Sequence, residues 1–352
     1  MITIGIDAHK REHAAVAIDG DGREIGHWRG PNDPEAWREL RDWVQGLGDE
    51  HHWGIEGAWS YGRGLAQSLV DVGATVDEVN ARWTALGRRT ARRSGKTDRL
   101  DARAVALFVC QEAPDLPRVE TEDETAVLDL LSTEREGAIA EATRLRNQIH
   151  ALLMQLDPGY KTSIPSLKSQ KGLAALEIYV APDRRPLQVE RAGAVQRLAQ
   201  RLRLALAQAR ELSDRIRALT AQSFAPLTRI CGVNLIAAGA LAGILGPGHR
   251  FCSDAQLAAY AGVAPLEASS AGVIRHRLNR GGNRRLNAAL YLIALSQLRH
   301  SPEAQAYVAR RTTEGKSKKE AIRALKRFIV RSVWREWQDC HAVGEASNLN
   351  AA

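Results

Sequence analysis

Short apolar segments alternate with polar turns through the first eighty residues of the chain. This pattern predicts strands over residues 2–6, 14–18, 23–29, 52–56 and 75–79, and helices over 34–47 and 65–72. The run Asp19-Gly20-Asp21-Gly22 indicates a hairpin turn, because Asp and Gly tolerate positive φ. Three strands in a meander, followed by alternating strands and helices, predict an α/β layer.

Two long segments further along have apolar residues at helical spacing. They cover residues 126–156 and about 189–219, and a polar connector joins them. Two such helices usually make an antiparallel hairpin or an oligomerising coiled coil, and the alternative is an internal helical core. Beyond residue 225 the pattern predicts helices over 284–298 and 318–337, while the small polar residues 341–352 predict a disordered tail.

These patterns give a fold class of α/β plus α. Residues 1–115 are expected to form the α/β domain, whose strand order along the chain is compatible with a ribonuclease-H-like architecture. Residues 120–222 are expected to form a helical or coiled-coil domain, and residues 225–340 a mostly helical C-terminal domain.

Composition adds an expected partner. The 352 residues carry a formal net charge of +8, and 40 of the 49 cationic residues are Arg. The planar guanidinium suits phosphates and base edges, so we expect a polyanionic partner, although a basic composition alone does not establish one. The four cysteines lie far apart, which disfavours a structural zinc site or a disulfide framework. Neither an apolar signal core nor a membrane-length apolar run is present in the sequence, so we expect a cytoplasmic protein and no membrane partner.

Four acidic residues are spaced so that their carboxylates can point toward one site. Asp7 and Glu56 end predicted strands, and Asp98 and Asp101 are three residues apart, so on a helix they share one face. Four converging carboxylates repel one another unless a divalent ion neutralises them, and hard oxygen ligands suit Mg²⁺ or Mn²⁺. Each acid taken alone is better explained as an ordinary surface charge or a helix cap. The combination favours a metal site, and two such metals can activate the attacking oxygen and steady the leaving one in phosphoryl transfer.

Cationic residues surround the acid pair and recur near the C-terminus. Residues 81–103 contain eight Lys or Arg and two Asp. Cations beside metal-binding acids hold a phosphate backbone close to the metal, although a solvated helix face is the alternative reading. The residues expected to bind nucleic acid are Arg88, Arg89, Arg92, Arg93, Lys96, Arg275, Arg277, Arg280, Arg284, Arg285, Lys318 and Lys319.

Several motifs together resemble one protein family. They are Gly5-Ile6-Asp7-Ala8-His9-Lys10, Ile55-Glu56-Gly57, Lys96-Thr97-Asp98-Arg99-Leu100-Asp101-Ala102, Gly262-Val263-Ala264-Pro265, Ser269-Ser270, and the run from His276 to Asn287. In this order they are similar to the DEDD transposases of bacterial insertion sequences, the IS110 family, which are relatives of the Piv DNA invertase. The resemblance covers nearly the whole chain.

The resemblance implies more than the spacing does. It implies a RuvC-like domain with the catalytic, metal-binding tetrad Asp7, Glu56, Asp98 and Asp101, a coiled-coil insertion, and a C-terminal transposase domain with a nucleophilic serine. The family usually has Gly after this serine, whereas Ala271 follows Ser270 here. Counting back from Arg275 favours Ser270, with Ser269 as the alternate.

The resemblance also implies partners and a reaction. They are a non-coding bridge RNA encoded by the element, donor and target DNA, and a homo-oligomer, a dimer or tetramer, assembled through the helical domain. The expected activity is RNA-guided DNA strand cleavage and exchange through a serine-phosphate intermediate. The alternatives are a RuvC-like, metal-dependent, structure-specific endonuclease and a nucleic-acid-binding protein without catalysis.

Overall fold

The computed structural model describes residues 1–81, 97–267, 276, 277, 279 and 281–349. The chain divides into two compact units. The first contains residues 1–125, 226–233 and 244–352, and the second contains residues 126–225 and 234–243. Within the described residues, we find no helix that is both long and apolar enough to span a membrane.

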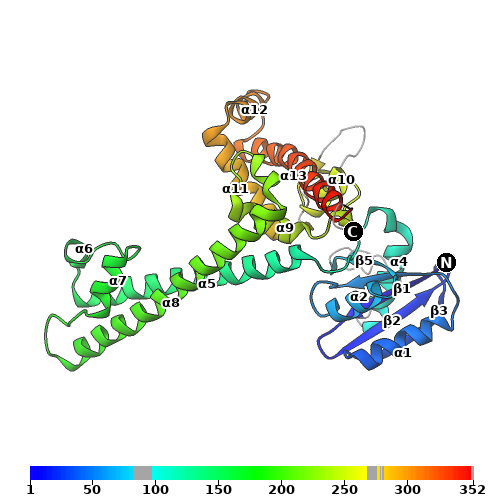
Figure 1. Cartoon of the computed structure of the whole chain (residues 1–352), viewed down its shortest axis with the longest axis horizontal. Helices are drawn as coiled ribbons and strands as arrows, with labels where there is room; N and C mark the ends of the chain where they lie inside the picture. Colours follow the sequence, from blue (N-terminus) through cyan, green and yellow to red (C-terminus); the bar gives the residue numbers. More distant parts are fainter. Residues whose placement is uncertain (82–96, 268–275, 278, 280, 350–352) are drawn as a thin grey trace. The chain divides into compact units, whose positions relative to one another are not determined.

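The first unit begins with a mixed five-stranded sheet (Figure 1). Its strands lie in the order β3-β2-β1-β4-β5 and are β1 (Ile2–Ala8), β2 (Glu12–Ile18), β3 (Glu24–Pro31), β4 (His51–Glu56) and β5 (Thr75–Val79). The meander β1-β2-β3 is antiparallel, and β4 and β5 are parallel to β1. All five strands were predicted from the sequence, and the ribonuclease-H-like class is confirmed.

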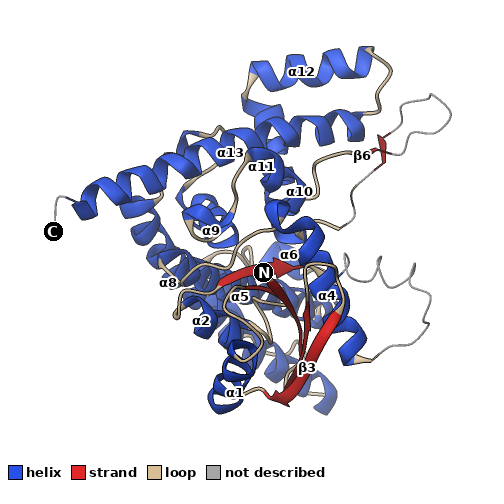
Figure 2. Cartoon of the chain, turned by 90° about the vertical axis from the view of Figure 1, so that its right-hand side faces the viewer, coloured by secondary structure: helices blue, strands red, loops and turns tan. Residues whose placement is uncertain are grey.

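Helices cover both faces of this sheet (Figure 2). Apolar residues of α1 (Pro34–Gln45) and α2 (Arg63–Val70) pack on one face in a core that includes Ile4, Ile6 and Ile55. The small residues of α4 (Asp98–Glu112) pack on the other face against β2.

Two glycines allow α4 to lie very close to the strands. A Cβ at Gly5 of β1 would be 2.2 Å from the carbonyl oxygen of Ala102, and a Cβ at Gly54 of β4 would be 2.2 Å from the Val109 side chain. The helix that carries Asp98 and Asp101 is therefore seated directly on the strand that carries Asp7.

The C-terminal part of the first unit is mostly helical. Its elements are the turn Gly248–Arg250, α10 (Asp254–Tyr260), β6 (Leu266–Glu267), β7 (His276–Arg277), α11 (Arg284–His300), α12 (Pro302–Thr313) and α13 (Lys318–Leu349). The helical C-terminal region agrees with the sequence prediction, which did not include α12. The expected disordered tail is corrected over residues 341–349, where α13 continues as helix.

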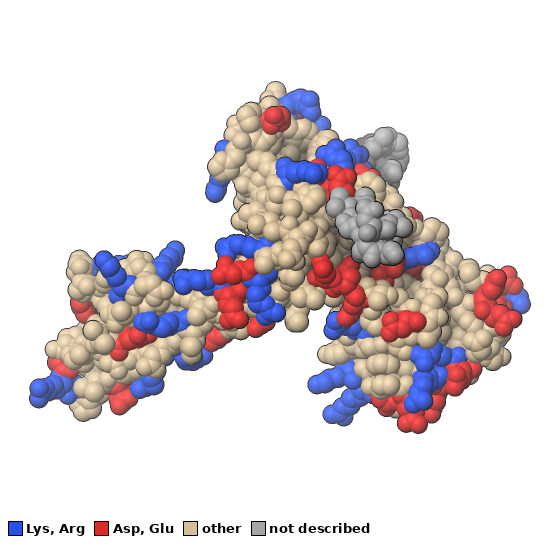
Figure 3. All heavy atoms as spheres, in the orientation of Figure 1, with Lys and Arg blue, Asp and Glu red and all other residues tan. Residues whose placement is uncertain are grey.

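The second unit is an antiparallel helical hairpin. It consists mainly of α5 (Glu124–Leu156) and α8 (Pro186–Ser223), with α6 (Tyr160–Ser163) and α7 (Gln170–Glu177) between them. Leu145, Ile149 and Leu153 of α5 are buried with Val195, Ala199 and Leu202 of α8. In addition, the unit includes residues 234–243, which contain most of α9 (Leu235–Leu245), and a Cβ at Gly243 would be 2.5 Å from the backbone nitrogen of Asp129. On the face shown in Figure 3, acidic and basic side chains are interspersed along the hairpin.

Candidate active site

The sheet places Asp7 and Glu56 side by side. Both residues lie at the ends of their strands, and they are direct partners in the parallel β1–β4 register. Asp7 is only 5% exposed, whereas Glu56 is partly exposed. The prediction that these two strand ends meet is borne out by this register.

The start of α4 brings the other two acids to the same region. Thr97 caps the helix, its hydroxyl accepting a hydrogen bond from the backbone N–H of Leu100 at 3.3 Å. Asp98 is the first helical residue, and Asp101 lies in the same turn and is buried. An acid in the first turn is favoured by the helix dipole, so the sequence Thr97-Asp98 both starts the helix and fixes its acids.

His9 joins this acidic group. Its Nε2 lies 3.1 Å from Oδ2 of Asp7 and 3.5 Å from Oδ1 of Asp98. Oxygen or nitrogen atoms of these three residues all lie within 4.8 Å of one another, which is a spacing that one metal ion spans. The sequence reasoning did not assign His9 a site role. The signal was its place in the turn directly after β1, two residues beyond Asp7.

The electrostatics of Asp7 fit a metal ligand. Burial raises the pKa of Asp7 to about 6; His9 opposes that rise, and Glu56, Asp101 and Asp98 add to it. Its Oδ2 is buried, and its contact in the described part of the chain is the 3.1 Å ion pair with Nε2 of His9. A buried carboxylate with a spare lone pair and neighbouring acids matches the hard oxygen ligands that Mg²⁺ or Mn²⁺ takes.

Arg29 of β3 forms ion pairs with Asp98 and with Glu12. Its guanidinium lies 3.4 Å from Oδ2 of Asp98 and also pairs with Glu12, with Nε 3.0 Å from Oε2. Asp98 therefore lies between the His9 imidazole and the Arg29 guanidinium, close to Asp7.

Many of the other candidate residues lie outside the described residues. This group comprises Ser269, Ser270, Arg88, Arg89, Arg92, Arg93, Lys96, Arg275 and Arg280. Arg277 lies in the short strand β7, which pairs with β6.

Two candidate pairs are placed at helix starts. Arg284 and Arg285 begin α11, and Lys318 and Lys319 begin α13. Arg284, Lys318 and Lys319 are exposed. The first turn of a helix disfavours cations through its dipole, so these residues do not serve helix stability there.

Comparisons with known proteins agree with this architecture. A transposase model for the DEDD domain of IS110 elements matches residues 4–158, and a model of the transposase IS116/IS110/IS902 family matches residues 225–309. A protein of insertion element IS110 from Streptomyces coelicolor is 31% identical over 66% of this chain and 68% of its own length. A protein of insertion element IS900 from Mycobacterium paratuberculosis is 26% identical over 99% of this chain and 98% of its own length.

The two segments matched by the family models contain the acidic motifs and the C-terminal motifs respectively. The first contains Asp7, Glu56, Asp98 and Asp101, and the second contains the loop before α11. The chain belongs to the IS110 family of DEDD transposases, which are DNA strand-transfer enzymes.

Proposed function

We propose that this transposase cleaves and exchanges DNA strands through a covalent serine-phosphate intermediate, assisted by a divalent metal at the acidic site and guided by a bridge RNA. The proposed metal site is supported by Asp7, His9 and Asp98, because one possible ligand atom of each residue lies within 4.8 Å of the others. Mg²⁺ or Mn²⁺ bound there would supply charge neutralisation for a phosphate. Glu56 and Asp101 complete the ligand set from the adjacent strand end and the same helix turn.

The serine part concerns Ser270, with Ser269 as the alternate. Its hydroxyl oxygen attacks a backbone phosphorus, the bond from phosphorus to one strand breaks, and the departing oxygen takes up a proton. A hydroxyl of the partner strand then attacks the phosphoserine, which restores the serine and joins the new strands. Each step exchanges one phosphate ester for another, so no external energy source is needed. Arg277, Arg284 and Arg285, which the sequence places after the serine, are suited to stabilising the phosphate charge.

The partners follow from the reaction. DNA binding belongs to a transposase, and the net charge of +8 suits a second polyanion such as a bridge RNA. We also propose a homo-oligomer that assembles through the helical hairpin, whose surface includes exposed apolar residues such as Leu130 and Leu204.

Covalent trapping on nicked DNA tests the serine. The unmodified protein is expected to form an adduct that survives denaturation, and Ser270→Ala is expected to bind DNA but form none. Ser269→Ala is the matched control and should retain the adduct. The reverse pattern would move the nucleophile to Ser269. Metal-dependent cleavage to free ends with no adduct in any variant would favour the RuvC-like endonuclease instead.

A further inference from the structure

Arg250 is a buried, charged residue that has no role in the proposed metal and serine steps. It ends the turn Gly248–Arg250 and is only 4% exposed. Burial by itself would lower its pKa, but Tyr260 and Glu78 more than offset this and raise the pKa above its ordinary value, so the guanidinium stays charged. A buried charge is costly unless it is paired and hydrogen-bonded, so its partners show what it holds together.

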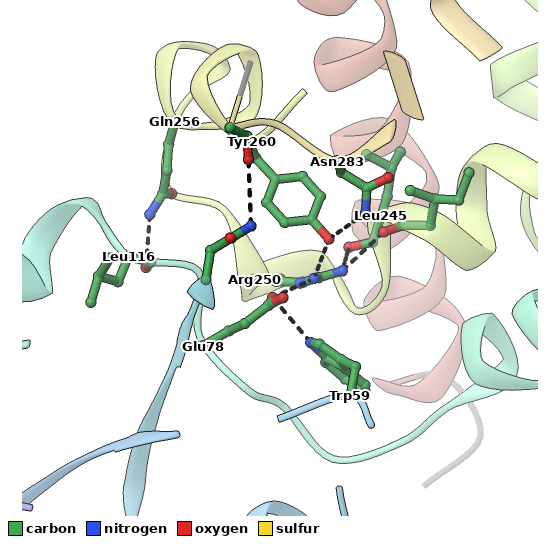
Figure 4. Close-up of polar contacts among 11 residues, drawn as sticks. Trp59, Glu78, Leu116, Leu245, Arg250, Gln256, Tyr260 and Asn283 are labelled. Atoms are coloured by element: carbon green, nitrogen blue, oxygen red, sulfur yellow. Dashed lines mark hydrogen bonds and ion pairs between the residues drawn. The ribbon is translucent and has the colours of Figure 1, made fainter. Parts of the chain in front are cut away.

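The partners of Arg250 come from two segments far apart in the sequence (Figure 4). Its Nη2 donates to Oε2 of Glu78 at 2.6 Å and to the hydroxyl of Tyr260 at 2.9 Å. Its Nη1 donates to the carbonyl oxygens of Ile244 and Leu245 at 2.9 and 3.1 Å. The guanidinium also lies 4.9–5.1 Å from the ring centroids of Trp59, Phe251 and Tyr260.

On the sheet side, these contacts reach the strand end that carries Glu56. Glu78 is the penultimate residue of β5 and pairs in register with Ile55, the neighbour of Glu56. Trp59, three residues after Glu56, donates from Nε1 to Oε2 of Glu78 at 3.1 Å. Arg250 therefore contacts β5, which is the strand next to β4, and the segment that follows Glu56.

On the other side, the contacts reach the start of α11. The hydroxyl of Tyr260 accepts from Nδ2 of Asn283 at 2.9 Å, and the backbone carbonyl of Tyr260 accepts from the backbone N–H of Asn283 at 2.7 Å. Asn283 in turn caps α11 by accepting from the N–H of Leu286 at 3.0 Å. A Cβ at Gly282 would be 2.2 Å from the backbone nitrogen of Gly262, so the loop before α11 is closely packed there.

A second contact ties the same loop to the sheet. Asn80, directly after β5, donates from Nδ2 to the carbonyl oxygen of Gly281 at 3.4 Å. The backbone carbonyl of Arg250 also accepts from the N–H of Arg118 at 3.2 Å. The start of α11 and the end of β5 are thus joined by contacts from several directions, with Arg250 at their centre.

We propose that Arg250 is a positioning residue of the strand-transfer reaction, which fixes the start of α11, with Arg284 and Arg285, relative to the strand ends that carry the acidic site. Arg250 does not touch DNA, because it is buried; it acts through Tyr260 and Asn283 on one side and through Glu78 and Trp59 on the other. The inference rests on the proposed function in that it treats the loop before α11 as part of the reaction centre.

Tyr260→Phe is the sharpest test. It removes the hydroxyl that links Arg250 to Asn283 but keeps the ring and leaves the Arg250–Glu78 pair in place. At saturating DNA, we expect its single-turnover rate of strand exchange to fall about tenfold or more, with its affinity for DNA changed less than twofold. Arg250→Lys keeps a positive charge opposite Glu78 but cannot bond to both Glu78 and the Tyr260 hydroxyl. This variant should therefore also exchange strands more slowly while its affinity for DNA changes little.

His52→Gln is the matched control for stability. His52 bonds to the buried Asp77 at 2.7 Å, so this variant also weakens a polar pair between β4 and β5, away from the Tyr260 link. It should lower the melting temperature and leave the exchange rate unchanged. A normal exchange rate in Tyr260→Phe, or an equal loss in His52→Gln, would overturn the positioning role.

Ser270→Ala measured in parallel separates this inference from the proposed function. Strand exchange by Ser270→Ala would reject the serine step, whereas the rate loss in Tyr260→Phe would still support positioning. If Ser270→Ala is inactive and Tyr260→Phe is normal, the serine step stands and the role of Arg250 is rejected.

Discussion

At the scale of single residues, the raised pKa of Asp7 means that its ionised form destabilises the fold unless a cation binds beside it. Because burial raises its pKa to about 6, the folded protein holds a proton on Asp7 at pH values where the unfolded chain has lost it. The contribution of Asp7 to stability is therefore full below about pH 4 and is lost as the pH rises through about 6. At higher pH the ionised carboxylate lowers the free energy of unfolding until a cation neutralises its charge.

A pH series of melting temperatures checks this sign. In chelator at pH 7, Asp7→Asn should be more stable than the unmodified protein, by up to about 3 kcal/mol. The difference should shrink as the pH falls to 5, and saturating Mg²⁺ at pH 7 should remove or reverse it. A variant that is less stable than the unmodified protein in chelator at pH 7 would contradict the electrostatic account of Asp7.

Asp98→Asn tests the proposed metal site from the helix side. The amide keeps the shape of the side chain but removes the charge that lies between His9 and Arg29, so strand exchange should be lost while the melting temperature changes little. Isothermal titration with Mn²⁺ should show weaker binding. Asp21→Asn, in the exposed turn between β2 and β3, is the control and should retain both activity and metal affinity. Full exchange activity of Asp98→Asn would remove Asp98 from the site.

The sequence predicted some of these residues and missed others for physical reasons. Asp7 and Glu56 could be found because strand ends are visible in the apolar pattern, and parallel strands bring their ends together. His9 was missed because its role depends on where the turn after β1 directs its ring. Arg250 was missed because its acidic partner, Glu78, is 172 positions away in the sequence, and no local pattern records that pairing.

At the level of elements, the seating of α4 on the sheet decides whether the acids converge. An added methyl group at Gly5 would meet backbone atoms of Ala102 and Ala106 at 2.2 Å, and backbone cannot move aside as a flexible side chain can. Gly5→Ala should therefore shift α4 away from β1, lower stability by about 1–3 kcal/mol and reduce strand exchange. Melting temperatures and exchange rates at fixed Mg²⁺ measure both effects.

Gly20→Ala provides the matched comparison for Gly5. Nothing lies within 4 Å of a Cβ built at Gly20, so this variant should behave like the unmodified protein. Equal stability and activity of the two alanine variants would show that the close approach of α4 is not needed.

The elements themselves were largely predictable where periodicity was strong. The strands and the two long helices follow clear alternation or helical spacing, and their bounds differ by a few residues from those in the structure. Helix α12 was missed although Ser301 and Pro302 form a normal helix start, because its buried residues, Ala304 and Val308, are few and small. The end of α13 was missed because small polar residues are compatible with either helix or coil.

The start of α13 carries a prediction about nucleic-acid binding. Lys318 and Lys319 are exposed in a helix turn whose dipole disfavours cations, so contact with phosphate is the expected use of their charge. The double variant Lys318→Gln/Lys319→Gln should weaken binding to all DNA sequences alike and reduce the slope of log affinity against log salt by about two. Fluorescence anisotropy across a salt series measures this slope. An unchanged slope would place these residues away from the DNA.

At the scale of the whole molecule, the chain combines a catalytic unit with a long helical hairpin. The acidic site and the loop before α11 both belong to the first unit, although about 180 positions of sequence separate Asp101 from Asn283. The hairpin lies between them in the sequence and holds none of the proposed catalytic residues.

The last prediction concerns assembly through the hairpin. The two helices are joined by an ion pair between Arg201 and Glu141 and by a hydrogen bond from Gln208 to Glu134, so Leu204 of α8 and Ile139 of α5 lie at the same level between these pairs. Both are exposed, Leu204 at 70% and Ile139 at 40%, and apolar side chains at one level of a hairpin make a surface suited to a second copy. Leu204→Glu should shift the sedimentation velocity profile toward monomer and reduce strand exchange. Val72→Glu, an equally apolar exposed position next to α2, should leave the oligomeric state unchanged. An unmodified protein that sediments as a monomer both alone and on DNA would reject assembly through the hairpin.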